Sequence, residues 1–156
     1  MIAVRAYRPT DAEPVEQIVT ECTRELRAVY RPELQAPATL SNPSPATNRV
    51  VALIGTSTIV GVAEFVTRPS VLYAQGVAVV SGYRRRGIAN ALLTHIAAVA
   101  TDMGIPTIEV ATIKETGNVA VFIRLGFHLV AERPSERFLG SNGQLVTEVT
   151  LQRHVA

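Results

Sequence analysis

The sequence is poor in the residues that build disulfides and metal centres. Cys22 is the only cysteine among 156 residues, and the chain has three histidines. A single cysteine excludes an intrachain disulfide and any metal site with several cysteine ligands. The histidines, His95, His128 and His154, lack the spacing that metal ligands usually have. We therefore predict that the protein binds no metal.

Long apolar runs are also missing. No segment approaches the roughly 18 consecutive apolar residues of a membrane helix. The N-terminal segment MIAVRAYRPTD carries charges at Arg5 and Arg8, where a signal peptide needs an apolar core. We therefore expect a cytoplasmic protein with no membrane partner.

Lysine is nearly absent, because Lys114 is the only one among 15 basic residues. Against 13 acidic residues these give a formal net charge of +2, which is too small to indicate a nucleic-acid partner. The positions of the arginines are therefore more informative than their number. With 47% hydrophobic residues and this length, the chain is expected to fold as a single domain over residues 1–156.

Apolar periodicity and turn residues predict an α/β (α+β) fold. Alternation predicts a strand over residues 2–7, and helical spacing predicts a helix that continues to Tyr30. Thr10 and Glu13 have the spacing of a capping box at the start of this helix. The proline-rich stretch 32–45 is expected to be irregular and to line a site.

Beyond that stretch, strands and helices alternate. Two strands joined by a tight turn are predicted over residues 49–69, and a third, more apolar strand over 71–80. The remaining elements are predicted as a helix over 87–103, a strand over 107–113, a helix over 115–125, and two strands over 128–134 and 145–154. We expect a mixed, mostly antiparallel sheet of six to seven strands with helices on both faces.

The segment YRRRGIANALL, residues 83–93, places three arginines and a glycine before an apolar helix. Positive charge at a helix N-terminus is unfavourable unless an anion binds there. The unpaired N–H groups of a helix start, approached through a glycine, suit a phosphate or pyrophosphate. A P-loop is excluded, because Ile88 and Ala89 follow Gly87 where that motif needs Lys and Ser or Thr. A dinucleotide fingerprint is also excluded, since its first glycine pair is absent.

Four segments in the same order resemble the GNAT superfamily of acyl-CoA-dependent N-acyltransferases. They are VRAYRPTDAEPVEQI as the opening strand and helix, VAVVSGYRRRGIANALL as the pyrophosphate motif, TIEVAT as the following strand, and VAVFIRLGF as the second-helix signature. The resemblance implies a GNAT-like fold with acetyl-CoA as cosubstrate. It also implies cofactor contacts from the strand, the turn and the second helix, at Val77, Ala78, Val79, Arg84, Arg85, Arg86, Gly87, Ile88, Ala89, Asn90, Asn118 and Phe122.

Acetyl transfer from a thioester to an amine needs a neutral amine, a stabilised oxyanion and a protonated leaving thiolate. By the resemblance, a tyrosine on the last helix is often the acid, but Phe122 occupies that position here. The preceding strands offer Tyr73 and Glu64 as candidate catalytic residues. Gln75 falls where some relatives keep a histidine, and its amide cannot act as a base.

Two functional hypotheses follow. The first is an N-acetyltransferase that transfers the acetyl group of acetyl-CoA to a primary amine by direct attack in a ternary complex. The second, favoured by Phe122, is an acyl-CoA-binding sensor or partner domain with little or no catalysis. By the resemblance, the acceptor, a small amine or a protein amine, is selected by residues 21–48, where Glu21, Glu25 and Glu33 would attract a cation. The closing strands would form the interface of a homodimer.

Overall fold

The computed structural model describes residues 1–33 and 47–155. The prediction that stretch 32–45 lines a site therefore falls almost entirely outside the described residues. In the described part, the helices are α1 (Ala12–Arg27), α2 (Ile88–Asp102) and α3 (Asn118–Arg124). The strands are β1 (Ile2–Ala6), β2 (Tyr30–Pro32), β3 (Asn48–Ile54), β4 (Thr58–Thr67), β5 (Leu72–Val79), β6 (Thr107–Ile113), β7 (His128–Gly140) and β8 (Leu145–His154).

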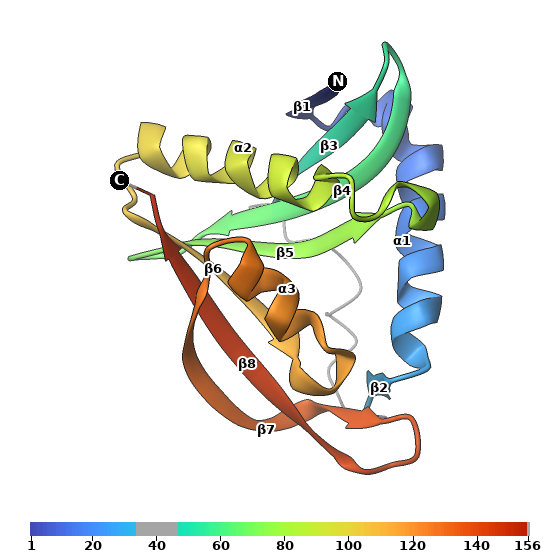
Figure 1. Cartoon of the computed structure of the whole chain (residues 1–156), viewed down its shortest axis with the longest axis vertical. Coiled ribbons are helices and arrows are strands. Elements are labelled where there is room, and N and C mark those ends of the chain that lie inside the picture. Colours follow the sequence, from blue (N-terminus) through green and yellow to red (C-terminus); the bar gives the residue numbers. More distant parts are fainter. Residues whose placement is uncertain (34–46, 156) are drawn as a thin grey trace.

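The strands form one sheet in the order β1-β3-β4-β5-β6-β8-β7-β2 (Figure 1). Every neighbouring pair is antiparallel except β5 and β6, which run parallel. The predicted α/β class and the mostly antiparallel sheet are confirmed. The predicted strand count of six to seven is slightly low, because the described sheet has eight strands. The additional strand is β2, a three-residue edge strand that ends in Pro32 and is too short to show an alternating pattern.

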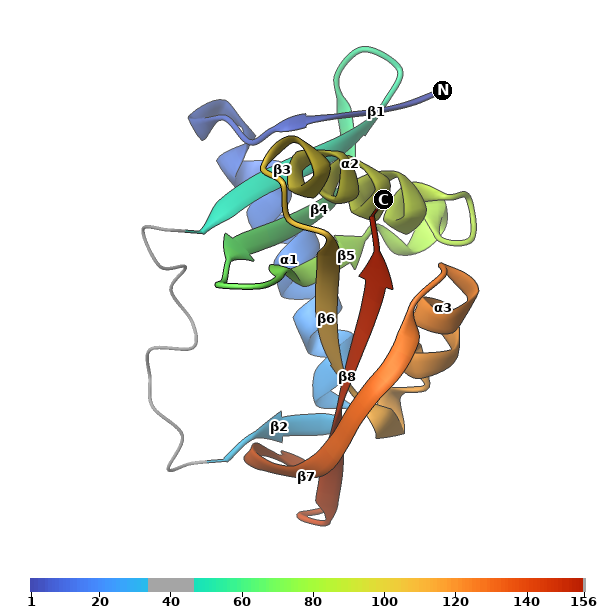
Figure 2. The same ribbon diagram turned by 90° about the vertical axis from the view of Figure 1, so that its left-hand side faces the viewer.

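Two apolar cores hold the helices against the sheet. Leu92, Leu93 and Ile96 of α2 are fully buried in the larger core on one face. Val15 and Ile18 of α1 are buried in a second core on the other face. Burying a leucine or isoleucine side chain contributes about 1.5–3 kcal/mol, so these contacts fix both helices on the sheet. Figure 2 shows α1 across the sheet from α3, and no helix in the described residues is long and apolar enough to span a membrane.

Asp11 fixes the start of α1, where the sequence pattern predicted a capping box at Thr10 and Glu13. The Asp11 carboxylate accepts the Arg8 backbone N–H at 2.8 Å, and two Arg5 guanidinium nitrogens donate to it at 2.7 and 3.0 Å. These hydrogen bonds hold the pKa of the Asp11 carboxyl below its usual value, and the bond from Arg5 has the largest effect. A short 3-10 turn over Pro9–Asp11 therefore leads into α1 at Ala12.

Candidate active site

The sheet opens between β5 and β6. These strands pair only at Leu72 with Ile108 and at Tyr73 with Glu109, and Figure 1 shows them diverging beyond that point. Since β5 continues to Val79, the edge of its C-terminal half has no partner strand among the described residues. Backbone groups that lack a partner strand are available to an extended ligand that carries amide groups of its own.

A β-bulge lies beside this opening. The pairing of β4 with β5 shifts between Val62 and Glu64, and Gly76 of β5 has a φ of +59°. Glycine adopts this left-handed conformation without strain, as at the first position of a bulge with one extra residue. The extra residue reverses the alternation of the strand. Val77 therefore packs against the core under α2, whereas Ala78 belongs to the core under α1.

The predicted cofactor residues of β5 divide between the two edges of the strand. Val80 donates its N–H to the Val60 carbonyl oxygen of β4 at 2.9 Å. Because alternate residues direct their backbone groups to opposite edges, Val79 and Val77 direct theirs toward the opening. Ala78 pairs with β4 instead. Of the three residues, Val77 is therefore placed to contact a ligand in the opening through its backbone. Val79 is placed to do so through its N–H, because its carbonyl oxygen already accepts from Arg84 Nε at 3.3 Å.

A cleft of about 300 Å³ occupies the opening. Five of the residues singled out in the sequence line it, namely Tyr73, Gln75 and Val77 of β5 and Asn118 and Phe122 of α3. The cleft is also lined by residues that sequence reasoning missed, from β2, β7 and β8: Tyr30, Arg137, Phe138 and Glu148. The structure thus brings residues from both halves of the chain together around one space.

The turn before α2, residues 85–90, has a backbone geometry that suits anion binding, and we call it the anion cradle. Arg85 and Gly87 have φ angles of +62° and +82°, so two left-handed residues curve the backbone ahead of the helix. No side chain caps the first turn of α2, and that turn contains no acidic residue. The N–H groups of the first turn, at Ile88, Ala89 and Asn90, are those that a helix leaves without a partner. Such a curved turn at a helix N-terminus is suited to phosphate groups.

The three arginines of the turn have different surroundings. Arg84 forms an ion pair with Glu25 of α1, with N···O distances of 2.6 and 3.0 Å. Its hydrogen bonds lower the pKa of Glu25. The Arg86 guanidinium lies 5.4 Å from the centre of the Tyr83 ring. The side chain of Arg84 therefore links the turn to α1. Arg85 and Arg86 are exposed at the surface beside the cradle.

Tyr73 lines the cleft between charged side chains. The Arg68 guanidinium lies 3.8 Å from the centre of its ring. Burial raises the pKa of the Tyr73 hydroxyl, and Arg68 and Arg137 oppose this shift only in part. The phenol therefore stays protonated at neutral pH, and it can donate a proton or a hydrogen bond but cannot act as a base.

Glu64 lies beside the bulge without lining the cleft. It is ion-paired with Arg49 at 3.0 Å, and its side chain is 18% exposed. One carboxylate oxygen is 2.9 Å from the position that a Cβ on Gly76 would occupy. Since Gly76 lines the cleft, the absence of a side chain there lets the Glu64 carboxylate approach the cleft wall.

Phe122 presents an apolar surface to the cleft. Its ring packs edge-on against Phe127, with 5.7 Å between ring centres and an interplanar angle of 74°. A phenyl ring has no proton to donate, so the acid must come from elsewhere. Asn118 begins α3, where its backbone N–H donates to the Thr116 hydroxyl at 3.2 Å, and it lines the same wall.

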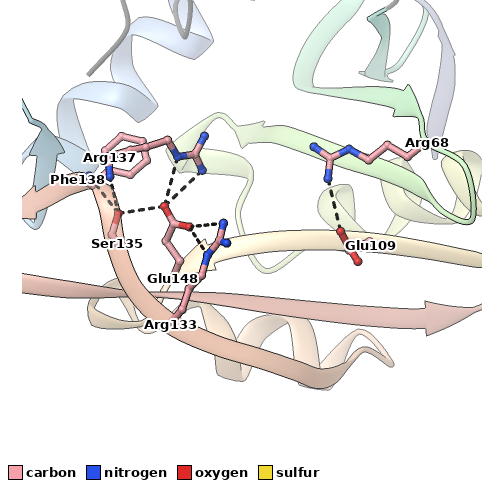
Figure 3. A network of polar contacts seen from close by, with 7 residues as sticks. All are labelled: Arg68, Glu109, Arg133, Ser135, Arg137, Phe138 and Glu148. Carbon is pink, nitrogen blue, oxygen red and sulfur yellow. Dashed lines mark hydrogen bonds and ion pairs between the residues drawn. The ribbon is translucent and has the colours of Figure 1, made fainter. Parts of the chain in front are cut away.

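Glu148 of β8 is the most buried acidic residue of the cleft wall. Its side chain is 10% exposed and accepts a hydrogen bond from the Ser135 hydroxyl at 3.0 Å. Arg133 and Arg137 of β7 also donate to it (Figure 3). One signal in the sequence could have revealed this residue. Glu148 lies two residues after the buried Val146 in the same strand, so both side chains face inward.

Comparisons with known proteins identify the family of the chain. Residues 12–127 match the model of the family described as "Acetyltransferase (GNAT) family". This match covers more than half of the chain, and the chain therefore belongs to the GNAT acetyltransferase family. No curated protein sequence matches the chain. Within the described residues, no group of three or more His, Cys, Asp or Glu side chains is arranged to hold a metal ion.

Solved structures share the fold over nearly the whole chain. A GCN5-related N-acetyltransferase from Kribbella flavida has a TM-score of 0.75 at 22% identity, covering 98% of this chain and 97% of its own. A Bacillus anthracis protein solved in complex with acetyl coenzyme A has a TM-score of 0.71 at 13% identity, covering 99% of both chains. The ribosomal-protein-S18-alanine N-acetyltransferase of Escherichia coli has a TM-score of 0.65 at 15% identity, covering 100% of this chain and 95% of its own.

Proposed function

We propose that the protein is an N-acetyltransferase that transfers the acetyl group of acetyl-CoA to a primary amine in a ternary complex. The observation that supports this proposal is that two features of the structure adjoin each other. The free edge of β5 ends at Val79, and the anion cradle at the start of α2 follows within ten residues. A ligand with an extended amide-containing arm and a pyrophosphate needs both features in this order.

The chain's own groups fit such a ligand. Backbone N–H groups of residues 85–90 bind the pyrophosphate, and the left-handed Gly87 lets it approach the backbone closely. The backbone of Val77 and Val79 pairs with the pantetheine arm along the opening. Asn118 and Phe122 close the other wall, and the phenyl ring excludes water from the reacting thioester.

Bound acetyl-CoA supplies an activated acetyl group: the amine nitrogen bonds to the acetyl carbon, the carbon–sulfur bond breaks, the amine loses a proton and the thiolate gains one. Tyr73 donates the proton to sulfur, since burial keeps its hydroxyl protonated. Glu64 accepts the proton of the amine at the bulge. Holding both reactants in one cleft supplies much of the remaining rate.

The test is amine-dependent release of coenzyme A thiol by the purified protein, measured over a panel of primary amines. Tyr73→Phe is expected to lower kcat about 100-fold or more, as for loss of a general acid, with an unchanged KM for acetyl-CoA. Glu64→Gln should lower kcat most at neutral pH, because more of the amine is already deprotonated at high pH.

Two control variants remove the same chemical groups away from both the cleft and the bulge. Tyr7→Phe and Glu132→Gln should keep the wild-type rate, since neither residue lines the cleft or lies against Gly76. Acetyl-CoA binding without thiol release for any amine would reject the enzyme and leave the acyl-CoA-binding sensor that Phe122 favours.

A further inference from the structure

Charged side chains lie in and around the cleft wall near Tyr73. Arg137 and Glu148 line the cleft, and Arg133 pairs with the same glutamate. Arg68 covers Tyr73 and lies 3.7 Å from Glu109 (Figure 3). Two arginines, Arg68 and Arg137, and two carboxylates, Glu109 and Glu148, thus act on the Tyr73 phenol. Which charge the cleft accepts therefore depends on which of these groups still has hydrogen-bonding capacity.

Glu148 cannot serve as the binding group for a cationic amine. One of its oxygens accepts from the Ser135 hydroxyl at 3.0 Å and from two Arg137 nitrogens at 3.4 Å. The other accepts from two Arg133 nitrogens at 3.3 and 3.4 Å. Both oxygens are already occupied by donors, two of which are permanently charged. Glu148 therefore holds the guanidinium groups of Arg133 and Arg137 on either side of its carboxylate.

Arg137 is the arginine that lines the cleft and still has guanidinium N–H groups available as hydrogen-bond donors. Its side chain is 44% exposed. Both of its contacts to Glu148 are long and fall on the same oxygen, and its remaining terminal nitrogen has no hydrogen-bond partner in the described part of the chain. The planar guanidinium matches a carboxylate through two parallel hydrogen bonds.

The walls around Arg137 are aromatic. Its guanidinium lies 5.5 Å from the centre of the Phe138 ring. That ring packs edge-on against Tyr30 at 5.1 Å, and both rings line the cleft. A ligand that places an anion on Arg137 therefore meets apolar surface beside it and the Tyr73 hydroxyl further in.

We propose that the acceptor is a small amine that carries a carboxylate, such as an amino acid. This inference rests on the proposed acetyltransferase activity and adds the chemical class of the acceptor. Arg137 binds the carboxylate, Tyr30 and Phe138 contact the apolar part, and the amine points toward Tyr73 and the bulge. Polyamines are expected to be poor acceptors, because both oxygens of Glu148 already accept hydrogen bonds and a polyamine has no carboxylate for Arg137. This differs from the expectation that Glu21, Glu25 and Glu33 attract a cation; Glu25 is instead paired with Arg84.

The test compares matched acceptors that differ only in the carboxylate. Thiol release is measured with the twenty protein amino acids, β-alanine and γ-aminobutyrate, and with the carboxamide of each. The best carboxylate acceptor should have a kcat/KM at least about 10-fold above that of its carboxamide, as for one charge-assisted contact. Arg137→Gln should raise the KM for that acceptor about 10- to 100-fold and abolish the preference, with the KM for acetyl-CoA unchanged.

Arg133→Gln is the matched comparison, because Arg133 pairs with the same glutamate but does not line the cleft. It should change the preference by a few-fold at most. Equal rates for carboxylates and carboxamides would overturn the proposal, and so would an equal loss on both from Arg137→Gln.

A binding measurement separates this proposal from the enzymatic one. In calorimetry with coenzyme A present, an N-acetyl amino acid should bind at least about 10-fold more tightly than its carboxamide, and Arg137→Gln should remove the difference. Thiol release that fails for all amines would reject the acetyltransferase. If, in addition, no N-acetyl amino acid bound better than its carboxamide, the carboxylate site would be rejected too.

Discussion

The proposed acid and the proposed anion site each depend on single residues. At the family's usual tyrosine position the chain has Phe122, whereas Tyr73 enters the same cleft from the facing strand β5. Burial raises the pKa of Tyr73, so its hydroxyl is suited to donating a proton. In the proposed mechanism the acid therefore lies on strand β5 and not on helix α3, and the Phe122 ring forms an apolar wall.

Gly87 provides a test of the anion cradle at the same scale. Gly87→Ala adds a methyl group to a residue with a φ of +82°, which should cost about 1–2 kcal/mol of stability. The methyl group also obstructs the close approach of a phosphate. We expect the Kd for acetyl-CoA, measured by calorimetry, to rise at least about 10-fold, as for loss of a hydrogen bond to a charged group.

Gly104→Ala is the control for this prediction. Gly104 has a φ of +72°, has open space around it and follows the other end of α2. It should lose similar stability without any change in the affinity for acetyl-CoA. An unchanged Kd in Gly87→Ala would show that the turn does not hold the cofactor.

The elements position the site through a few polar contacts. Arg84 joins the turn before α2 to α1 through Glu25, and its Nε donates to the Val79 carbonyl at 3.3 Å. One arginine therefore ties together the end of β5, the turn and a helix on the opposite face. The position of the cradle depends on α1, although α1 contributes no backbone group to it.

The start of α1 predicts a defined dependence of stability on pH. The pKa of Asp11 is lowered in the folded protein, chiefly by its hydrogen bond from Arg5. Its contribution is therefore fully present above the unfolded pKa of about 3.9 and is lost as the pH falls through the folded pKa. Asp11→Asn should lose about 1–2 kcal/mol at pH 7 in urea unfolding, and this difference should shrink at pH 3.

Asp102→Asn is the control for Asp11, because Asp102 is exposed at the C-terminal end of α2. A negative charge there opposes the helix dipole, so its removal should leave stability unchanged or slightly higher. A constant difference between wild type and Asp11→Asn from pH 7 to pH 3 would contradict the ion pair with Arg5.

Most elements were predictable because their patterns are local. The apolar run of α2 and the alternation of β8 determine which face is buried, and the motif at residues 84–89 marked the turn. The short strand β2 and the bulge at Gly76 were not predictable, since neither has a periodic signal. The position of Arg137 and Glu148 in the same cleft as Tyr73 was also missed. These residues are brought together by the register of β7 with β8 and the order of the sheet, which sequence spacing does not reveal.

At the scale of the whole molecule, the cleft exists because strand pairing at the centre of the sheet changes from antiparallel to parallel. Among the described strands, only β5 and β6 are parallel neighbours, and they separate after two paired residues. The antiparallel strands on either side form two halves that are joined at this narrow contact, one covered by α1 and α2 and the other by α3 (Figure 1). The proposed cofactor enters where the halves part, and the proposed acceptor is selected by the half formed by β7 and β8.

The most direct measurement is calorimetric titration of the folded protein, with its fold verified by circular dichroism, with acetyl-CoA and with acetyl-4′-phosphopantetheine. The second compound keeps the arm and lacks the pyrophosphate. We predict one acetyl-CoA bound per chain with a Kd of about 1 μM, equivalent to roughly −8 kcal/mol, and binding of the truncated compound at least about 10-fold weaker. No binding of acetyl-CoA, or equal binding of both compounds, would contradict the role assigned to the cleft and the turn.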